Sequence, residues 1–147
     1  ESMKTLTPKP DDIQRAWYVV DATDLPLGRL STRVASILCG KNKPYYVRNI
    51  DTGDYVIVIN ADKVRVTGLK SLQKIYKTYS GYPSGLKEIP FQRMLEKHPT
   101  QIIEHAVRGM MPKTVLGDAM FKKLKVYAGT EHPHVAQKPV ELNLKEK

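Results

Sequence analysis

Most of the residues able to do chemistry in this chain are cations, and many of them fall in two segments that lack carboxylates. Residues 25–50 contain five basic residues and residues 63–87 contain six, and neither segment contains an acidic one. The cations are Arg29, Arg33, Lys41, Lys43 and Arg48 in the first segment, and Lys63, Arg65, Lys70, Lys74, Lys77 and Lys87 in the second. Ammonium and guanidinium groups bind phosphates, so this pattern predicts a basic face that holds a polyanion.

The composition of the whole chain agrees with a polyanionic partner. The 147 residues include 24 Lys and Arg against 15 Asp and Glu, which gives a formal net charge of +9. Such an excess repels itself and adds nothing to the stability of a fold, so we interpret it as a binding property. The alternative is a protein that is merely basic and soluble. The 41% hydrophobic content is ordinary for a folded domain.

Candidate contacts with nucleic acid combine cations with a few aromatic and imidazole rings. They are Arg29, Arg33, Lys41, Lys43, Arg48, Lys70, Lys74, Lys77, Tyr82, Arg108, Lys113, Lys122, Lys123, Lys125, His132 and His134. Cations hold phosphates, while exposed rings can stack on unpaired bases. Tyr45 and Tyr46 lie among these cations, and packing in the core is as good an explanation for them as stacking. The glycine loop of residues 81–85 has little bulk, which suits close approach to a sugar–phosphate backbone.

Nucleotide-binding and hydrolase motifs are absent. A dinucleotide-binding turn needs three glycines, and only Gly28 is present after the first predicted strand. A phosphate-binding loop ending at Gly40 and Lys41 would need a glycine where Ala35 stands. Ser84 lies in a predicted loop without the strand-to-helix turn that exposes a nucleophilic serine. We therefore predict no catalytic residue.

The sequence gives equally little support to a catalytic thiol or to a metal site. Cys39 lies beside the apolar side of a predicted helix, where a single cysteine usually packs as a small hydrophobic residue. His132 and His134 could supply two metal ligands, but a zinc site needs three or four. We predict no metal, no cofactor and no small-molecule substrate. The single cysteine favours a reducing compartment, and no apolar run approaches the roughly 18 residues of a membrane span.

The pattern of apolar residues predicts alternating strands and helices. Strands are expected over Trp17–Asp21, Tyr55–Ile59, residues 63–67 and Ile75–Tyr79. The first helix should enter through Pro26, bury Leu27, Leu30, Val34, Ile37 and Leu38, expose Arg29 and Arg33, and end at Gly40. Tyr55–Ile59 is apolar throughout, which is typical of a parallel strand covered on both faces.

The second half of the chain is predicted to be helical before a final basic strand. Pro90 and Pro99 should each begin a helix, and Ile102, Ile103, Ala106, Val107 and Met110 should form the buried stripe of the second one. A last helix is expected at Leu116, Met120 and Leu124, followed by a basic strand over residues 122–127. These elements predict a three-layer α/β/α domain with a mostly parallel sheet of about four strands. We expect an N-terminal arm at residues 1–15, one domain at 16–139 and a C-terminal tail at 140–147.

Several short motifs resemble the ribosomal protein L-thirteen family of the large subunit. The strongest begins at Val107 and Arg108, continues through Gly109-Met110-Met111-Pro112 and Gly117, and ends in Leu124-Lys125-Val126-Tyr127-Ala128-Gly129. Further matching pieces begin at Trp17, Leu27, Gly40, Gly53, Gly81 and His132. The chain departs from the family pattern at three sites: Val47-Arg48 replaces a common Thr-Pro, Ser84 replaces a glycine, and Asp118 replaces a basic or amide residue.

The resemblance implies a structural component of the large ribosomal subunit that binds 23S rRNA and supports subunit assembly and translation. It implies neighbouring large-subunit proteins as further partners, no catalytic role, and a location in the bacterial cytoplasm or in an organellar ribosome. Asp118 would repel phosphate, so we expect it to point away from RNA or to cap its helix. Two alternatives remain from the residues themselves: an enzyme acting on RNA or nucleotides through an unrecognised site, and a soluble adaptor.

Overall fold

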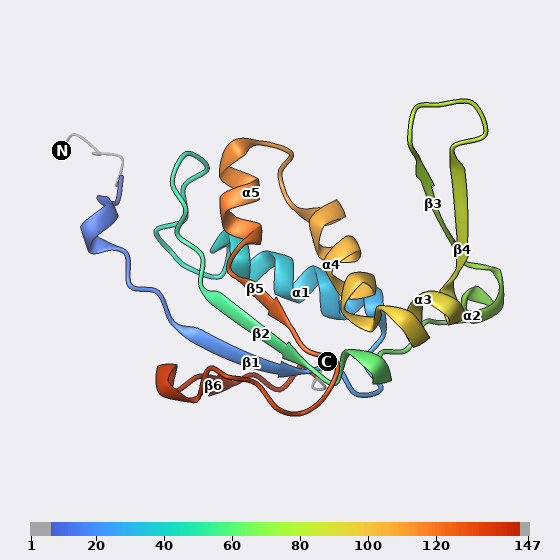
Figure 1. The fold of residues 1–147 in the computed structure, drawn as a ribbon. Helices are drawn as coiled ribbons and strands as arrows, with labels where there is room; N and C mark the ends of the chain where they lie inside the picture. The colour runs from blue at the N-terminus through green and yellow to red at the C-terminus, as the bar shows by residue number, and fades with distance from the viewer. Residues whose placement is uncertain (1–6, 145–147) are drawn as a thin grey trace.

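A parallel four-stranded sheet forms the centre of the protein in the computed structural model, which describes residues 7–144 (Figure 1). Its strands are β1 (Trp17–Asp21), β2 (Tyr55–Ile59), β5 (Leu124–Val126) and β6 (Val140–Glu141), in the order β5-β2-β1-β6. All three neighbouring pairs are parallel. The predicted α/β class and mostly parallel sheet of about four strands are confirmed.

The uninterrupted apolar sequence of β2 reflects burial on both faces of the sheet. Tyr18 and Val20 of β1 lie opposite Val56 and Val58 of β2, while Val19 lies opposite Ile57 on the other face. Val56, Ile57 and Val58 are all completely buried. A strand covered on both sides has no solvent face, so it needs no alternation of polar residues.

Helices α1 (Leu27–Cys39), α4 (Pro99–Met110) and α5 (Val115–Phe121) lie together on one side of the sheet (Figure 1). The predicted apolar stripe of α1 is buried as expected, with Leu30, Val34 and Leu38 inaccessible to solvent. Gly40 ends α1 in a left-handed conformation at φ 80°. A side chain there would also overlap Thr52, which explains the need for glycine.

The opposite face of the sheet is covered by the segment that follows β5. The rings of Trp17 and Tyr55 stack at 4.3 Å between centroids, and the His134 ring lies 5.3 Å from Trp17. The Tyr127 hydroxyl and His134 Nε2 are 2.7 Å apart, which anchors the segment. This third layer contains the 3₁₀ turn η3 (Val135–Gln137) where the prediction had α-helix.

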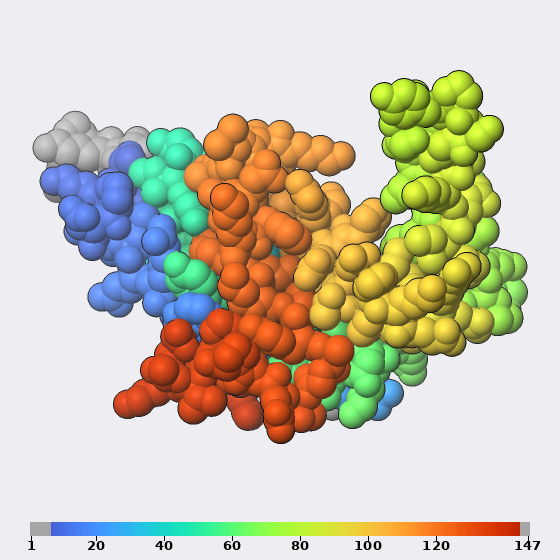
Figure 2. All heavy atoms as spheres, viewed as in Figure 1, coloured from blue at the N-terminus to red at the C-terminus, as the bar shows by residue number. Residues whose placement is uncertain are grey.

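A β-hairpin extends away from this body (Figures 1 and 2). It consists of β3 (Ile75–Tyr79) and β4 (Leu86–Pro90), which are antiparallel. At its base lie the short helices α2 (Lys70–Gln73) and α3 (Phe91–Lys97). The remaining elements are the 3₁₀ turns η1 (Pro10–Asp12) and η2 (Ala61–Lys63). The hairpin places residues 79–86 well clear of the sheet.

Four details differ from the predicted elements. Residues 63–67 form no strand but a single bridge, in which Arg65 N–H donates to Leu25 O and Arg65 O accepts from Leu27 N–H. Leu124 belongs to β5 rather than to the last helix, and Met110 is 46% exposed rather than buried. Strands β4 and β6 were not predicted, since their charges and prolines conceal the pairing. Val140 and Glu141, in the expected tail, pair with β1 as an edge strand.

Candidate nucleic-acid interface

Four cations converge on a groove beside the first turn of α1. Arg29 comes from α1 and Arg65 from the bridge that pairs with Pro26, while Lys70 and Lys74 come from α2 and the residue after it. The groove is closed on its far side by Ala106 and Met110 of α4. Residues from three separate parts of the sequence therefore place their positive charges around one concave surface.

The wall of this groove is open at Gly28. A side chain built there would have no heavy atom within 4 Å, so the glycine is not required by packing inside the protein. Its absence of a side chain leaves the backbone of α1 accessible from the groove. Arg29, Arg65 and Lys70 are all exposed, and none of them takes part in an ion pair within the described residues 7–144. Their charge is available to an external anion.

Of the four cations around this groove, Arg65 is the one that was not among the predicted site residues. It was interpreted as part of a half-exposed strand, where a charge is usually solvated. The bridge to Pro26 instead brings its side chain next to Arg29. Its position inside the second acid-free segment, residues 63–87, was the available signal.

A second basic hollow adjoins the groove through Met110. Lys41 and Arg48, from the loop after α1, line this hollow together with Met110, Met111 and residues of α5. Met110 lines both concavities, and its sulfur lies 3.6 Å from the Thr32 hydroxyl of α1. The predicted cations Arg29, Lys41, Arg48, Lys70 and Lys74 thus share one continuous surface. Arg33 is exposed one helical turn beyond Arg29 and lines a third concavity with it.

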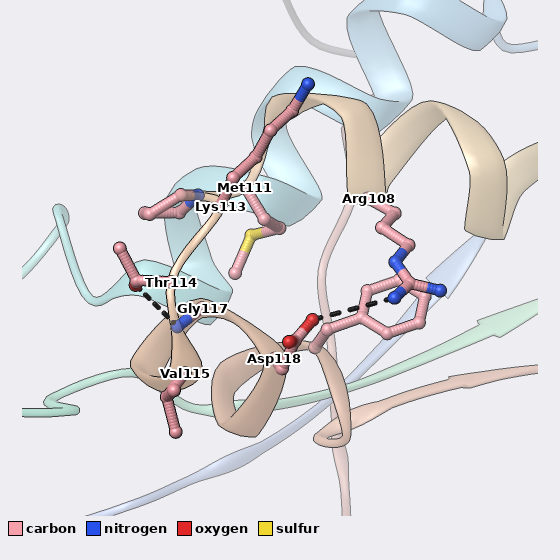
Figure 3. A pocket seen from close by; sticks show the side chains of 9 residues that line it. Arg108, Met111, Lys113, Thr114, Val115, Gly117 and Asp118 are labelled. Carbon is pink, nitrogen blue, oxygen red and sulfur yellow. Dashed lines mark hydrogen bonds and ion pairs between the residues drawn. The ribbon is translucent and has the colours of Figure 1, made fainter.

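The loop between α4 and α5 forms a smaller hollow, shown in Figure 3. Thr114 caps α5 by accepting a hydrogen bond from Gly117 N–H at 3.2 Å. Arg108 pairs with Asp118 at 3.7 Å and lies over the Phe121 ring, while Lys113 extends away from this pair. Asp118 therefore faces Arg108 on the surface, and it neutralises that cation rather than capping its helix.

The tip of the hairpin presents an aromatic ring on a tight turn. Gly85 N–H donates to Tyr82 O at 3.0 Å, and Ser84 takes a left-handed φ of 61° after Pro83. Proline followed by a positive φ is typical of a type II turn. The Tyr82 side chain is 75% exposed. A ring held in this way can stack on an unpaired base.

Two predicted phosphate ligands instead form ion pairs within the fold, in which Lys43 is half-buried and Lys123 is buried. The Lys43 ammonium lies 2.7 Å from the Asp54 carboxylate and also donates to Gln14 O. Lys123 is 6% exposed, donates to Leu38 O at 3.2 Å and pairs with Asp51. Burial lowers the pKa of Lys123, and its hydrogen bond to Asp51 opposes that effect. These contacts hold the loop after α1 against the sheet, so neither lysine is free to bind RNA.

The burial of Lys123 corrects one expectation from the sequence. Lys122, Lys123 and Lys125 were all predicted as contacts with nucleic acid. Of the three, only Lys122 and Lys125 are exposed. A carboxylate at position 123 would face Asp51 in a buried site, so replacing Lys123 by glutamate is expected to unfold the protein.

The remaining candidate contacts already interact with other side chains of the protein. Lys77 pairs with Glu88 across the hairpin at 2.8 Å, with 60% of its side chain exposed. Lys74 lies over the Tyr76 ring at 5.2 Å. His132 and His134 are half-buried near Trp17, and His132 Nδ1 accepts a hydrogen bond from His134 N–H. The two histidines therefore help to pack the third layer of the fold.

Neither a metal site nor a reactive thiol finds support in the part of the chain that the structure describes. Within residues 7–144, no group of three or more His, Cys, Asp or Glu side chains could hold a metal ion. Cys39 is buried and its thiol lies 3.7 Å from the Met111 sulfur, as expected of a packing residue. Burial raises the pKa of the Cys39 thiol, so it is poorly suited to act as a nucleophile. No helix in the described part is long and apolar enough to cross a membrane.

This fold and surface define a small α/β protein that presents a continuous basic surface. A family model described as ribosomal protein L13 matches residues 15–133. The large ribosomal subunit protein uL13 of Thermobifida fusca (strain YX) is 60% identical over 138 residues, which are 94% of this chain and 93% of that protein. The corresponding protein of Hahella chejuensis (strain KCTC 2396) is 56% identical over 142 residues, 97% of this chain and 100% of that one. The chain belongs to the ribosomal protein L13 family.

Proposed function

We propose that this protein is a structural constituent of the large ribosomal subunit that binds 23S rRNA and supports subunit assembly. The proposal rests on one observation. The chain is 56–60% identical to large-subunit proteins over nearly its whole length. The motifs that indicated this family are distributed from the first strand to the C-terminal segment. The function therefore follows from the complete domain and not from one local pattern.

The rRNA contacts that we propose are the exposed cations of the groove and the hollow beside it. Arg29, Arg65 and Lys70 lie around the first, and Lys41 and Arg48 lie around the second. Exposed cations on a concave surface can neutralise several phosphates of one RNA segment, and the counterions that they release drive binding. We propose supporting contacts by Lys74, which also lines the groove, and by Arg33, Lys113, Lys122 and Lys125, whose charges lie elsewhere on the surface.

We propose that two further residues contact the RNA through their shape rather than through a charge. Gly28 leaves the groove wall without a side chain, so a sugar–phosphate backbone can approach α1 closely. Tyr82 offers its ring at the tip of the hairpin, between β3 and β4, and is not part of the groove. Lys43 and Lys123 are excluded from the interface, because each is committed to a carboxylate inside the fold.

The protein is not an enzyme, and its place is the ribosome. We propose the bacterial cytoplasm as its location, because both relatives above are bacterial proteins. An organellar ribosome remains the alternative. The partners that we propose are 23S rRNA and neighbouring large-subunit proteins, with no small-molecule substrate.

Sedimentation tests the proposed function. In a lysate fractionated on a sucrose gradient, the protein should travel with the large subunit and leave it only at high salt. A protein that stays at the top of the gradient at low salt would contradict the proposal. It would favour the soluble adaptor or an enzyme acting on free RNA.

A further inference from the structure

The exposed apolar residues of this protein are concentrated in one short stretch. Ten large hydrophobic residues are exposed in the described residues 7–144, and six of them lie between positions 69 and 86. They are Leu69, Leu72, Ile75, Tyr79, Tyr82 and Leu86. Scattered exposed leucines are normal on protein surfaces, but a concentration of this kind usually marks an interaction site.

The hairpin has one buried face and one uncovered face. Tyr76 is 9% exposed, and its ring meets His105 of α4 edge-on at 5.5 Å, so this side of β3 faces the body. Successive side chains of a strand point to opposite faces. Ile75 and Tyr79 therefore point away from α4, and so do their partners across the hairpin, Pro90 and Leu86. Ile75, Tyr79 and Leu86 are 46%, 67% and 55% exposed. We call this the outward face.

An isolated two-stranded hairpin is at best marginally stable in water. Only the side of β3–β4 that carries Tyr76 is packed against the body, and the strands extend beyond it (Figure 2). The outward face thus lacks the second layer that a sheet ordinarily needs. Helix α2 adjoins the hairpin base (Figure 1), and Leu72 within it and Leu69 just before it add to the uncovered apolar surface.

The charges on the outward face indicate what kind of partner covers it. Its only ionisable cross-strand pair is Lys77 with Glu88, whose charged atoms are 2.8 Å apart, so the pair adds no net charge. The Glu88 side chain is 45% exposed and would repel a phosphate. Tyr79 is the one aromatic ring of the outward face, and its other apolar residues, Ile75, Leu86 and Pro90, have no flat ring to stack on a base. A mainly aliphatic surface without net charge is complementary to another protein rather than to RNA.

We propose that the outward face of β3–β4 is a docking surface for a second large-subunit protein that presents an aliphatic, uncharged segment. This inference rests on the proposed function, because the particle supplies the partner. The basic groove and Tyr82 at the hairpin tip would then contact RNA, while the outward face of the hairpin holds protein. The chain would join the two kinds of component through separate surfaces.

Site-specific photocross-linking in intact large subunits tests this proposal. The photoreactive amino acid p-benzoylphenylalanine replaces Leu86 on the outward face or, as the matched control, the adjacent Lys87. Lys87 pairs with Thr78 on the other face of the hairpin. Subunits isolated from cells that express each variant are irradiated, and the adducts are treated separately with ribonuclease and protease. The expected result is a ribonuclease-resistant adduct from position 86 to aliphatic residues of one ribosomal protein, in clearly higher yield than from position 87.

Three results would overturn the docking surface: an adduct to RNA from position 86, no adduct, or equal yields to protein from both positions. Absence of both variants from the subunit peak would overturn the proposed function as well, and the gradient itself reports that outcome. As a second measure, Leu72→Ser with Leu86→Ser should enter subunits about tenfold less well than the unchanged chain in competition. Its affinity for isolated rRNA should stay unchanged, and equal entry into subunits would contradict the proposal.

Discussion

Lys123 and Asp51 form a buried ion pair that ties the start of β5 to the loop before β2. The Lys123 ammonium also donates to the carbonyl oxygen of Leu38 near the end of α1. Asp51 accepts a further hydrogen bond from Gly53 N–H at 3.1 Å. One lysine therefore connects a strand, a helix end and the loop that carries Lys41 and Arg48.

Replacing Lys123 by alanine should lower the free energy of unfolding by about 3–5 kcal/mol, because it leaves the Asp51 carboxylate partly buried without its cation. Urea unfolding followed by circular dichroism measures this change. The matched control is Lys122→Ala, which removes an exposed lysine one residue away and should alter stability by less than about 0.5 kcal/mol. Equal losses in the two variants would contradict the structural role of Lys123.

The buried Cys39 thiol makes stability depend on pH in the alkaline range. Burial raises the pKa of Cys39 in the folded state, so the unfolded chain loses that proton first as the pH rises. The contribution of Cys39 is complete below its unfolded pKa of about 8.5 and should decline above it. Urea unfolding between pH 8 and pH 10 should show this decline, and Cys39→Ala should reduce it. A variant with the same pH dependence as the original would rule out this assignment.

Two glycines of the α4–α5 region should respond oppositely to alanine. A side chain at Gly117 would overlap the carbonyl oxygen of Pro112, whereas one at Gly109 would meet no atom within 4 Å. Gly117→Ala should therefore cost about 1–3 kcal/mol of unfolding free energy by overpacking. Gly109→Ala, near the end of α4, should add up to about 1 kcal/mol through helix propensity. Thermal melts of both variants measure these changes, and equal shifts of the melting temperature would contradict the steric role of Gly117.

Ser84 carries backbone strain at the hairpin tip. A residue with a side chain pays a cost for the left-handed φ of 61° that glycine does not pay. Ser84→Gly should stabilise the hairpin by up to about 1 kcal/mol, after the entropy cost of glycine is subtracted. Hydrogen exchange at Ser80 N–H, which donates to Gly85 O, reports the change locally. Faster exchange in the variant would show that the serine is not strained.

The sequence predicted the core of this fold well, because the core depends on local periodicity. The stripe of α1, its end at Gly40 and the fully buried β2 all follow from spacing and side-chain type. Strands β4 and β6 could not be predicted in the same way. Both are short and rich in charge or proline, and each exists only because a distant or preceding strand offers hydrogen bonds.

The types of residue in the candidate interface could be predicted from the sequence, but their arrangement in space could not. The acid-free segments contain all four cations that lie around the groove, but the sequence could not show that Lys43 and Lys123 face carboxylates. Those pairs join residues 11 and 72 positions apart. Arg65 was missed for the same reason, because its role depends on a bridge to Pro26. A charge pattern shows how many cations a segment contains, but tertiary contacts determine which of them are free to bind an external anion.

The salt dependence of binding to large-subunit rRNA tests the central claim most directly. If about six phosphates are neutralised, the logarithm of the affinity should fall with the logarithm of salt concentration at a slope of about −4 to −5. Arg29→Gln with Arg65→Gln removes two groove cations and should make the slope shallower by about 1.5. The control is Lys138→Gln, which removes an exposed lysine outside the groove and should leave the slope unchanged. A steep slope that only the groove variant reduces supports the account, whereas an affinity independent of salt would contradict it.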